Sequence, residues 1–118
     1  CMSSICGIET IEGAPIFYSV AKNALNFYVK TYSRVLAKDS IRINAIAPGN
    51  ILFNGSTWDT KLKNDKRRTK KIISDRVPLN KFGTTNDIAE LAIYLCSDKS
   101  SFVTGSIFTV DGGQTVSV

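Results

Sequence analysis

The sequence contains no histidine and only three cysteines, Cys1, Cys6 and Cys96, among its 118 residues. The cysteines lack the spacing of metal-ligand pairs, so a zinc site is not expected. Three cysteines also cannot form a paired disulfide framework. We therefore expect Cys6 and Cys96 to be buried free thiols in a reducing compartment, and we predict that the protein is cytoplasmic.

Long hydrophobic runs, repeats and low-complexity segments are missing as well. No apolar run approaches the roughly 20 residues of a membrane-spanning helix, and no basic and then apolar leader opens the chain. We expect no membrane association and no secretory signal. Hydrophobic residues make up 43% of the chain and charged residues 21%, which is typical of a globular protein with one small core.

The first half of the chain alternates between strand and helix patterns. Cys1–Cys6 predicts the end of a strand, and Ile8–Pro15 a loop. From Ile16 to Ala37 apolar residues recur at three- and four-residue steps, which predicts a half-buried helix. Ile41–Ala47 is apolar enough for a strand covered on both faces. The buried face expected for the helix consists of Ala21, Ala24, Leu25, Tyr28, Tyr32, Val35 and Leu36.

The second half continues the alternation. We expect a loop over Asn50–Lys61, a charged helix over Leu62–Arg76, and a helix that starts with the capping pattern Thr84–Asp87 and ends near Ser97. A last strand is expected over Ser106–Val110. The order strand, helix, strand, helix, helix, strand predicts an α/β fold in which helices cross over between parallel strands. We expect one partial domain over residues 1–118.

Tyr18 and Lys22 form the pattern Tyr-x-x-x-Lys at the start of the first predicted helix. Four residues are about one helical turn, so both side chains leave the same face. An ammonium group beside a phenol favours the phenolate form, which makes the pair a candidate proton donor and acceptor. The alternative is a tyrosine and a lysine that are merely exposed on the first turn.

Several further blocks occur in a fixed order along the chain. Together with the Tyr-x-x-x-Lys pattern they resemble the short-chain dehydrogenase/reductase family, and the resemblance covers almost the whole chain. It implies the C-terminal half of a Rossmann-like, doubly wound parallel sheet, and NAD or NADP as cofactor. The blocks are Ser3–Gly7, Arg42–Gly49, Asp87–Glu90, Val103–Gly105 and Val110–Gly113.

Members of this family are typically about twice as long as this chain. The sequence begins with Cys1 and contains no glycine-rich dinucleotide fingerprint. We therefore interpret it as a piece of a longer protein, with an internal start at Met2 as the alternative. The phosphate-binding turn, the residue that selects NAD or NADP, and an active-site asparagine would then lie upstream.

The resemblance also implies roles for individual residues. Tyr18 would be the general acid and base, and Lys22 would assist it and hydrogen-bond the nicotinamide ribose. Ser4 would orient the substrate carbonyl group, with Ser3 as its competitor. The spacing of Ser4 and Gly7 favours Ser4. The loop from Ser4 to Tyr18 is at the long end for the family and is expected to hold one extra residue.

Pro48, Gly49 and Ile51 resemble the segment whose backbone holds the nicotinamide carboxamide. Relatives often carry threonine at the position of Phe53, so a side-chain contact to the cofactor is in doubt there. Phe53 and Trp58 either form a substrate lid or are a small hydrophobic cluster beneath a loop. Asn44 is expected to be structural, and Asp111–Gly113 to be a turn.

A basic run extends over Lys61–Lys71, where seven cations are opposed only by Asp65. It is either a solvated helix surface or a surface that attracts an anionic substrate such as a nucleotide sugar, a coenzyme A ester or acyl carrier protein. Nucleic acid is not expected as a partner because no aromatic residues interleave the charges.

The function predicted from these observations is an NAD(P)-dependent oxidoreductase that interconverts a carbonyl compound and an alcohol. Two alternatives remain: a non-catalytic relative that binds a dinucleotide, and a fragment without activity when isolated. The resemblance further implies a homodimer or homotetramer that uses the helix of Tyr18 and the last strand.

Overall fold

The computed structural model describes residues 1–117 and leaves Val118 outside the description. Strands β1 (Ala45–Pro48) and β2 (Ile107–Val110) pair in parallel along their whole length. On the other edge of β1, Met2 forms a parallel bridge with Ile46. The order is therefore N-terminal segment, β1, β2, with β1 in the centre. The predicted first strand is reduced to this bridge, because the chain turns at once into the short 3-10 helix η1 (Ile5–Gly7).

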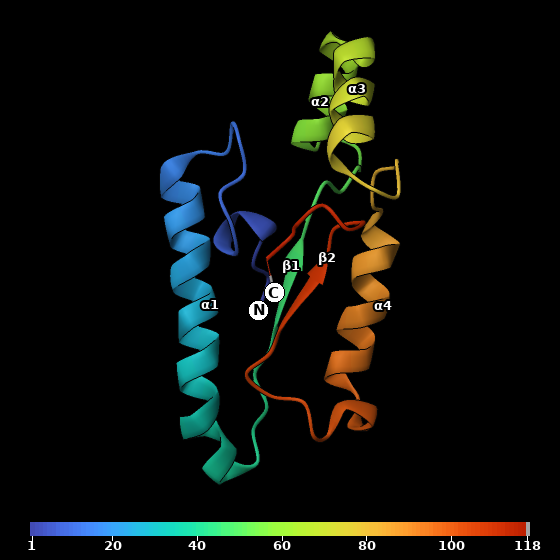
Figure 1. The fold of residues 1–118 in the computed structure, drawn as a ribbon. Helices are drawn as coiled ribbons and strands as arrows, with labels where there is room; N and C mark the ends of the chain where they lie inside the picture. The colour runs from blue at the N-terminus through green and yellow to red at the C-terminus, as the bar shows by residue number, and fades with distance from the viewer. Residues whose placement is uncertain (118) are drawn as a thin grey trace.

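Two helices lie on opposite sides of the strand pair (Figure 1). Helix α1 (Ile16–Leu36) precedes β1 and continues into the 3-10 helix η2 (Ala37–Asp39), while α4 (Thr85–Cys96) precedes β2. Both helices were predicted with nearly these bounds. The expected cap of α4 is confirmed, since Thr84 and Asp87 form a capping box with bonds in both directions.

The segment between β1 and α4 differs from its prediction. The expected loop and single helix are in fact two helices, α2 (Thr57–Asn64) and α3 (Lys66–Arg76). Ser56 caps the first helix, and its Oγ accepts a hydrogen bond from the amide of Asp59. Asp65 has a non-helical backbone and caps the second helix. The break was missed because a lone aspartate within a charged stretch is also compatible with a continuous helix.

The buried face of α1 was predicted only in part, because Leu25 and Leu36 of the expected face are half-buried and its other five members are exposed. Val29 and Ser33 are the buried residues of this helix, whereas Tyr28 is 49% and Val35 51% exposed. The reason is a close backbone approach: a Cβ atom on Gly105 would lie 2.4 Å from Ser33 Oγ. A helix that packs against main chain places small and polar side chains at the contact, so hydrophobicity does not identify that face. The exposed stripe contains Tyr28 and Tyr32, whose rings stack with centroids 5.1 Å apart.

Two side chains just before β1 form hydrogen bonds with the end of α4 and with the segment that leads to β2. The Arg42 guanidinium donates to the carbonyl groups of Leu95 and Ser97, at 2.9 and 3.2 Å, and so closes the C-terminal end of α4. Asn44 donates to the carbonyl of Val103 at 2.8 Å and accepts from the amide of Ser106. Asn44 is thus structural, as expected. The predicted strand starts late because these residues bond to loops.

The expectation for the cysteines holds only in part. All three are free thiols, but Cys96 is exposed and Cys6 is half-buried. Cys96 lies at the end of α4, where its side chain does not reach the core. Within residues 1–117, no helix is long and apolar enough to cross a bilayer.

Candidate active site

A cleft of about 510 Å³ opens between α1, the end of β1 and the start of α2. It brings together side chains and backbone from four separate parts of the chain. All six residues proposed from the sequence line it, namely Ser4, Tyr18, Lys22, Pro48, Gly49 and Ile51. The competitor Ser3 also lines it, as do Phe53 and Trp58. The cleft lies at the end of the parallel sheet where β1 terminates, which is the edge at which such sheets bind ligands.

The two serines differ in what their hydroxyl groups do. Ser3 Oγ donates to Asn26 Oδ1 at 2.5 Å and is committed to α1. Ser4 caps η1, and its Oγ accepts from the amide of Cys6 at 3.2 Å. Within residues 1–117 the Ser4 hydroxyl donates to no other group, so its proton is available to a ligand in the cleft. This difference supports Ser4 over Ser3.

Gly7 determines how closely η1 approaches α1. A Cβ atom there would lie 2.6 Å from the carbonyl carbon of Lys22 and 2.8 Å from the amide of Asn23. The carbonyl of Gly7 accepts from the side chains of Asn23 and Asn26, at 3.0 and 3.1 Å. The segment with Ser4 is therefore held against the turn of α1 that carries Lys22, which explains the spacing of Ser4 and Gly7.

Asn26 supports the site without lining the cleft, and the sequence reasoning missed it. It accepts from Ser3 and donates to Gly7, so it joins both ends of the η1 segment to α1. A signal was available, because Asn26 follows Lys22 by four residues, as Lys22 follows Tyr18, and the three share one face of the helix.

Tyr18 and Lys22 lie together as their spacing predicts. Lys22 Nζ is 5.5 Å from the centroid of the Tyr18 ring, within the range of a cation–π contact. The same ammonium group donates to the carbonyl of Met2 at 2.8 Å, which ties α1 to the segment beside β1. Tyr18 is 43% exposed. Its phenol group forms no hydrogen bond with any residue of the described part of the chain, so it is open to a ligand.

In the segment after β1, the backbone N–H and C=O of one residue have no hydrogen-bond partner within the chain up to Ser117. Leu52 donates to the carbonyl of Gly83 at 2.9 Å, and the amide of Gly83 donates to Asn50 at 3.0 Å. Neither the amide nor the carbonyl of Ile51, which lies between them, is hydrogen-bonded to another group of residues 1–117. An adjacent N–H and C=O pair matches the acceptor and donor of a carboxamide. The residues present therefore fit the nicotinamide group.

Aromatic residues line the side of the cleft that faces α2. The ring of Trp58 lies 5.5 Å from that of Phe82, and Lys61 Nζ is 4.4 Å from the Trp58 centroid. Trp58 thus belongs to a small cluster that also lines the cleft, while the substrate lid stays a prediction. Phe53 is half exposed at the same wall. It offers no hydroxyl group where relatives often carry threonine.

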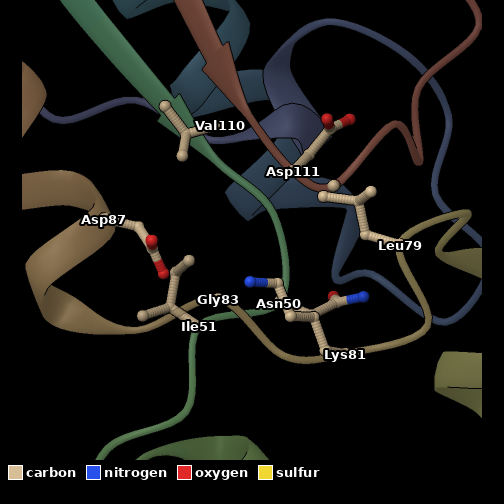
Figure 2. Close-up of a pocket in the computed structure, with 9 residues that line it drawn as sticks. Asn50, Ile51, Leu79, Lys81, Gly83, Asp87, Val110 and Asp111 are labelled. Atoms are coloured by element: carbon tan, nitrogen blue, oxygen red, sulfur yellow. The ribbon is translucent and has the colours of Figure 1, made fainter.

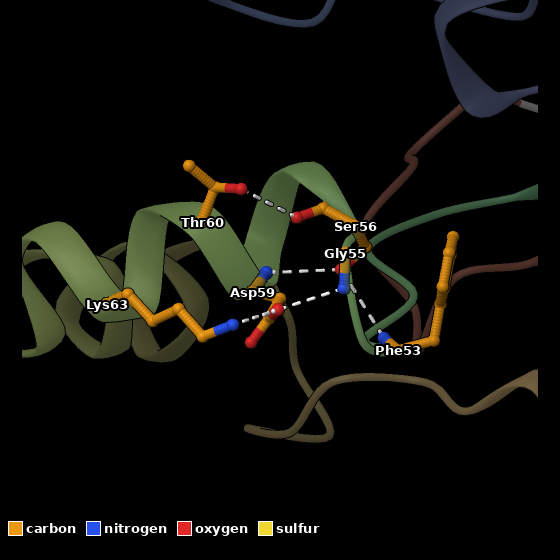
Figure 3. A network of polar contacts seen from close by, with 6 residues as sticks. All are labelled: Phe53, Gly55, Ser56, Asp59, Thr60 and Lys63. Atoms are coloured by element: carbon orange, nitrogen blue, oxygen red, sulfur yellow. Dashed lines mark hydrogen bonds and ion pairs between the residues drawn. The ribbon is translucent and has the colours of Figure 1, made fainter.

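A polar network fixes the start of α2 (Figure 3). Ser56 Oγ accepts from the amides of Phe53 and Asp59, and Asp59 accepts from the amide of Gly55 at 2.9 Å and from Lys63 at 2.7 Å. These bonds, led by the one from Lys63, lower the pKa of the Asp59 carboxyl. The network positions Phe53 and Trp58 on either side of the cap.

A second cavity of about 120 Å³ borders the segment after β1 that contains Asn50 and Ile51 (Figure 2). Asn50, Leu79, Lys81 and Asp111 contribute to its lining, and Ile51 lines both cavities. Asp111 accepts from the amides of Gly113 and Thr115, at 2.9 and 2.7 Å, which confirms the expected turn. This cavity lacks Tyr18 and Lys22 and is too small for a dinucleotide.

Comparison with known sequences assigns the chain to a family. The sequence profile described as Enoyl-(Acyl carrier protein) reductase matches residues 1–115. The chain is 36% identical over 113 residues to the uncharacterized oxidoreductase YmfI of Bacillus subtilis, covering 95% of this chain and 43% of that protein. It is 35% identical over 115 residues to the 3-oxoacyl-[acyl-carrier-protein] reductase FabG of Thermotoga maritima, covering 98% and 44%.

Solved structures give the same result. The L-sorbose reductase of Gluconobacter frateurii, complexed with NADPH and L-sorbose, matches with a TM-score of 0.87 at 30% identity, over 99% of this chain and 46% of that one. A 4-hydroxyisoleucine dehydrogenase complexed with NADH matches with a TM-score of 0.84 at 29% identity, over 99% and 46%. The chain thus spans less than half the length of these relatives.

The predicted α/β class, with a parallel sheet that forms part of a Rossmann-type fold, is confirmed by these structures. The order of the sequence blocks, the profile match and the curated relatives agree. The chain belongs to the short-chain dehydrogenase/reductase family.

Proposed function

We propose that this chain carries the catalytic residues of an NAD(P)-dependent oxidoreductase that interconverts a carbonyl compound and an alcohol. The observation that carries the proposal is the convergence of Ser4, Tyr18 and Lys22 on one cleft beside the open peptide of Ile51. Solved relatives complexed with NADH and with NADPH support this class of cofactor. A protein that only bound a dinucleotide would not require the phenol and the ammonium group together.

When bound, the nicotinamide supplies or accepts the hydride. In the reductive direction Tyr18 Oη gives its proton to the substrate oxygen, and in the oxidative direction it takes the proton from the alcohol. The Ser4 hydroxyl donates to the same oxygen, and this bond strengthens as negative charge develops there. The Lys22 ammonium favours the phenolate that remains after proton transfer.

The same cleft supplies contacts for the cofactor. The amide and carbonyl of Ile51 would hold the carboxamide and so orient the ring. Pro48 and Gly49 shape the turn that leads to this peptide, and Lys22 would hydrogen-bond the ribose. Because the chain spans under half the length of its relatives, the activity is proposed for the protein that the complete gene encodes. We expect the 118-residue chain alone to be inactive.

Replacement of the phenol tests the mechanism. In the gene-encoded protein, Tyr18→Phe should lower turnover by about 10²- to 10⁴-fold, since it removes the general acid. The Kd for NADH or NADPH should change little. Turnover is followed by nucleotide oxidation against a panel of ketones, ketoses and 3-oxoacyl thioesters. Tyr94→Phe, at an exposed tyrosine of α4, is the matched control. Unchanged turnover in Tyr18→Phe would refute the mechanism.

The charge distribution supports an anionic substrate. Residues 57–76, which form α2 and α3, carry eight cations and three carboxylates, and the resulting excess equals the net charge of +5 of the whole chain. The remaining residues balance to zero. Lys61 lies on this surface and contacts Trp58 at the cleft. We therefore expect kcat/KM for an anionic carbonyl compound to fall with added salt, and that for a neutral one to stay constant.

A homo-oligomer is part of the same proposal. Helix α1 exposes an apolar stripe that includes Phe17, at 90% exposure, and Phe27, at 72%. The family expectation places this helix at the contact between copies, and exposed apolar side chains suit such a contact. Light scattering of the gene-encoded protein should give a dimer or a tetramer, and a monomer would contradict this part of the proposal. The cytoplasmic location and the single partial domain stay predictions.

A further inference from the structure

The loop between η1 and α1 connects the two segments that carry Ser4 and Tyr18, and it also contacts α3. Arg76, the last residue of α3, forms an ion pair with the carboxylate of Glu12 in this loop. Arg76 Nη1 also donates to the backbone carbonyl of Glu12 at 3.3 Å. The guanidinium group therefore holds both the side chain and the main chain of a residue 64 positions away.

Glu9 anchors the same loop in another direction. Its Oε2 accepts from the amides of Val116 and Ser117, at 3.3 and 3.2 Å, and from the Ser117 hydroxyl at 2.5 Å. The hydroxyl bond is the main reason that the pKa of the Glu9 carboxyl is lowered. The loop is thus attached to the C-terminal segment, so that Glu12 presents a fixed partner to Arg76.

Helices α2 and α3, the α2–α3 hairpin, pack mainly on each other and project beyond the end of the strands (Figure 1). The other ion pairs in the described chain, Lys63–Asp59 and Lys71–Asp75, join neighbouring turns of one helix. Among residues 1–117 the pair of Glu12 and Arg76 is the one that joins separate elements. It links the hairpin, which carries Trp58 at the cleft, to the segment that leads to Tyr18.

We propose that Glu12 and Arg76 are positioning residues that form a latch between the α2–α3 hairpin and the loop before α1. The latch holds the Trp58 wall over the cleft, and its opening admits the ligand. Its role in substrate access rests on the proposed function, whereas its existence does not. Two charged side chains at the surface, one of them 85% exposed, interact weakly enough to open and close readily.

Charge reversal in the gene-encoded protein tests the latch by hydrogen–deuterium exchange. Glu12→Arg and Arg76→Glu should each speed amide exchange in residues 57–76 by about two- to fivefold, the range of a surface ion pair. The double variant Glu12→Arg/Arg76→Glu restores the attraction and should return exchange to the original rate. Lys71→Glu is the matched control, because it breaks another exposed pair, inside α3, and leaves the latch intact.

Three outcomes would overturn the latch: unchanged exchange in both single variants, no recovery in the double variant, or faster exchange throughout β1, β2 and α4. The last outcome would mean general destabilisation. None of these measurements requires turnover. The latch can therefore fail while the oxidoreductase proposal stands, and the oxidoreductase proposal can fail while the latch stands. If both hold, the single variants should change KM by the same two- to fivefold factor with kcat within twofold, and the double variant should restore KM.

Discussion

Backbone contacts and amide side chains hold the wall of the cleft that carries Ser4 and Tyr18, whereas charged side chains and helix caps hold the wall that carries Trp58. On the first wall, Gly7 lies directly against the backbone of α1, and the Asn26 side chain donates a hydrogen bond to the Gly7 carbonyl. On the second, the ion pairs of Lys63 and Lys71 lie within single helices, and one pair reaches another element.

Under the proposed function, the difference corresponds to two mechanical roles. Close backbone packing tolerates little displacement, because a shift of a few tenths of an ångström already produces a clash. That property suits groups that must hold a proton donor at a fixed distance from the reacting atom. Exposed ion pairs are weak and screened by salt, which suits a wall that moves when ligands enter and leave.

The largest effect on the rigid wall is expected from Gly7→Ala. The added methyl group would overlap the backbone of Lys22 and Asn23, which cannot rotate away, so the free energy of unfolding should fall by about 3 kcal/mol. Urea titration of the gene-encoded protein measures this loss. Gly13→Ala is the control, because open space surrounds Gly13 and only its positive φ of 80° opposes alanine, at about 1 kcal/mol. Equal losses would show that Gly7 is no contact point.

Arg42→Met should follow, with a loss of about 2 kcal/mol in the free energy of unfolding. The substitution removes charged hydrogen bonds to the carbonyl groups of Leu95 and Ser97 at the end of α4. Arg34→Met, at an exposed position of α1, should stay within about 0.5 kcal/mol. Thermal or chemical denaturation separates the two. A loss at Arg34 as large as at Arg42 would argue against the capping role.

Two capping residues compare the α2–α3 hairpin with a helix that packs on the strands. Thr84→Ala and Ser56→Ala each remove one helix cap, and each is expected to cost about 1 kcal/mol. Since α4 packs on β1, the first loss should lower the unfolding midpoint of the whole protein. The second should speed hydrogen exchange in α2 and leave the midpoint nearly unchanged. An equal shift of the midpoint in both variants would mean that the hairpin does not open independently.

The smallest effect concerns pH. Hydrogen bonds from the amide and hydroxyl of Thr84 lower the pKa of Asp87 in the folded state. The carboxylate therefore favours folding above its unfolded pKa of about 4, and this contribution is lost as the pH falls through the lower, folded pKa. Asp87→Asn should reduce the unfolding midpoint at pH 7, and the difference from the unmodified protein should vanish in acid. A difference independent of pH would exclude the charge as its cause.

Local signals in the sequence predicted much of the framework. The amphipathic run of α1, the capping pattern of Thr84 and Asp87, and the short apolar strands depend on neighbours within a few residues. The Tyr-x-x-x-Lys spacing placed Tyr18 and Lys22 on one helical face for the same reason. The resemblance to the family then predicted that Ser4 and Ile51 would lie near them, and all four line one cleft.

Other features required contacts between distant residues, and local patterns do not contain them. The buried face of α1 is set by Gly7 and Gly105, which approach it from two separate segments. The break at Asp65 depends on how α3 folds back on α2, and the ion pair of Glu12 and Arg76 spans 64 positions.

The sequence by itself determined the class of fold, the family and the residue types available for proton transfer, because periodicity, capping and motif order are local properties. The tertiary structure alone decided which serine keeps a free hydroxyl, which backbone groups of Ile51 are left without partners, and which residues form the ion pair between the hairpin and the loop before α1. These depend on which hydrogen-bonding groups are already satisfied by partners elsewhere in the chain, and only the folded arrangement determines those partners.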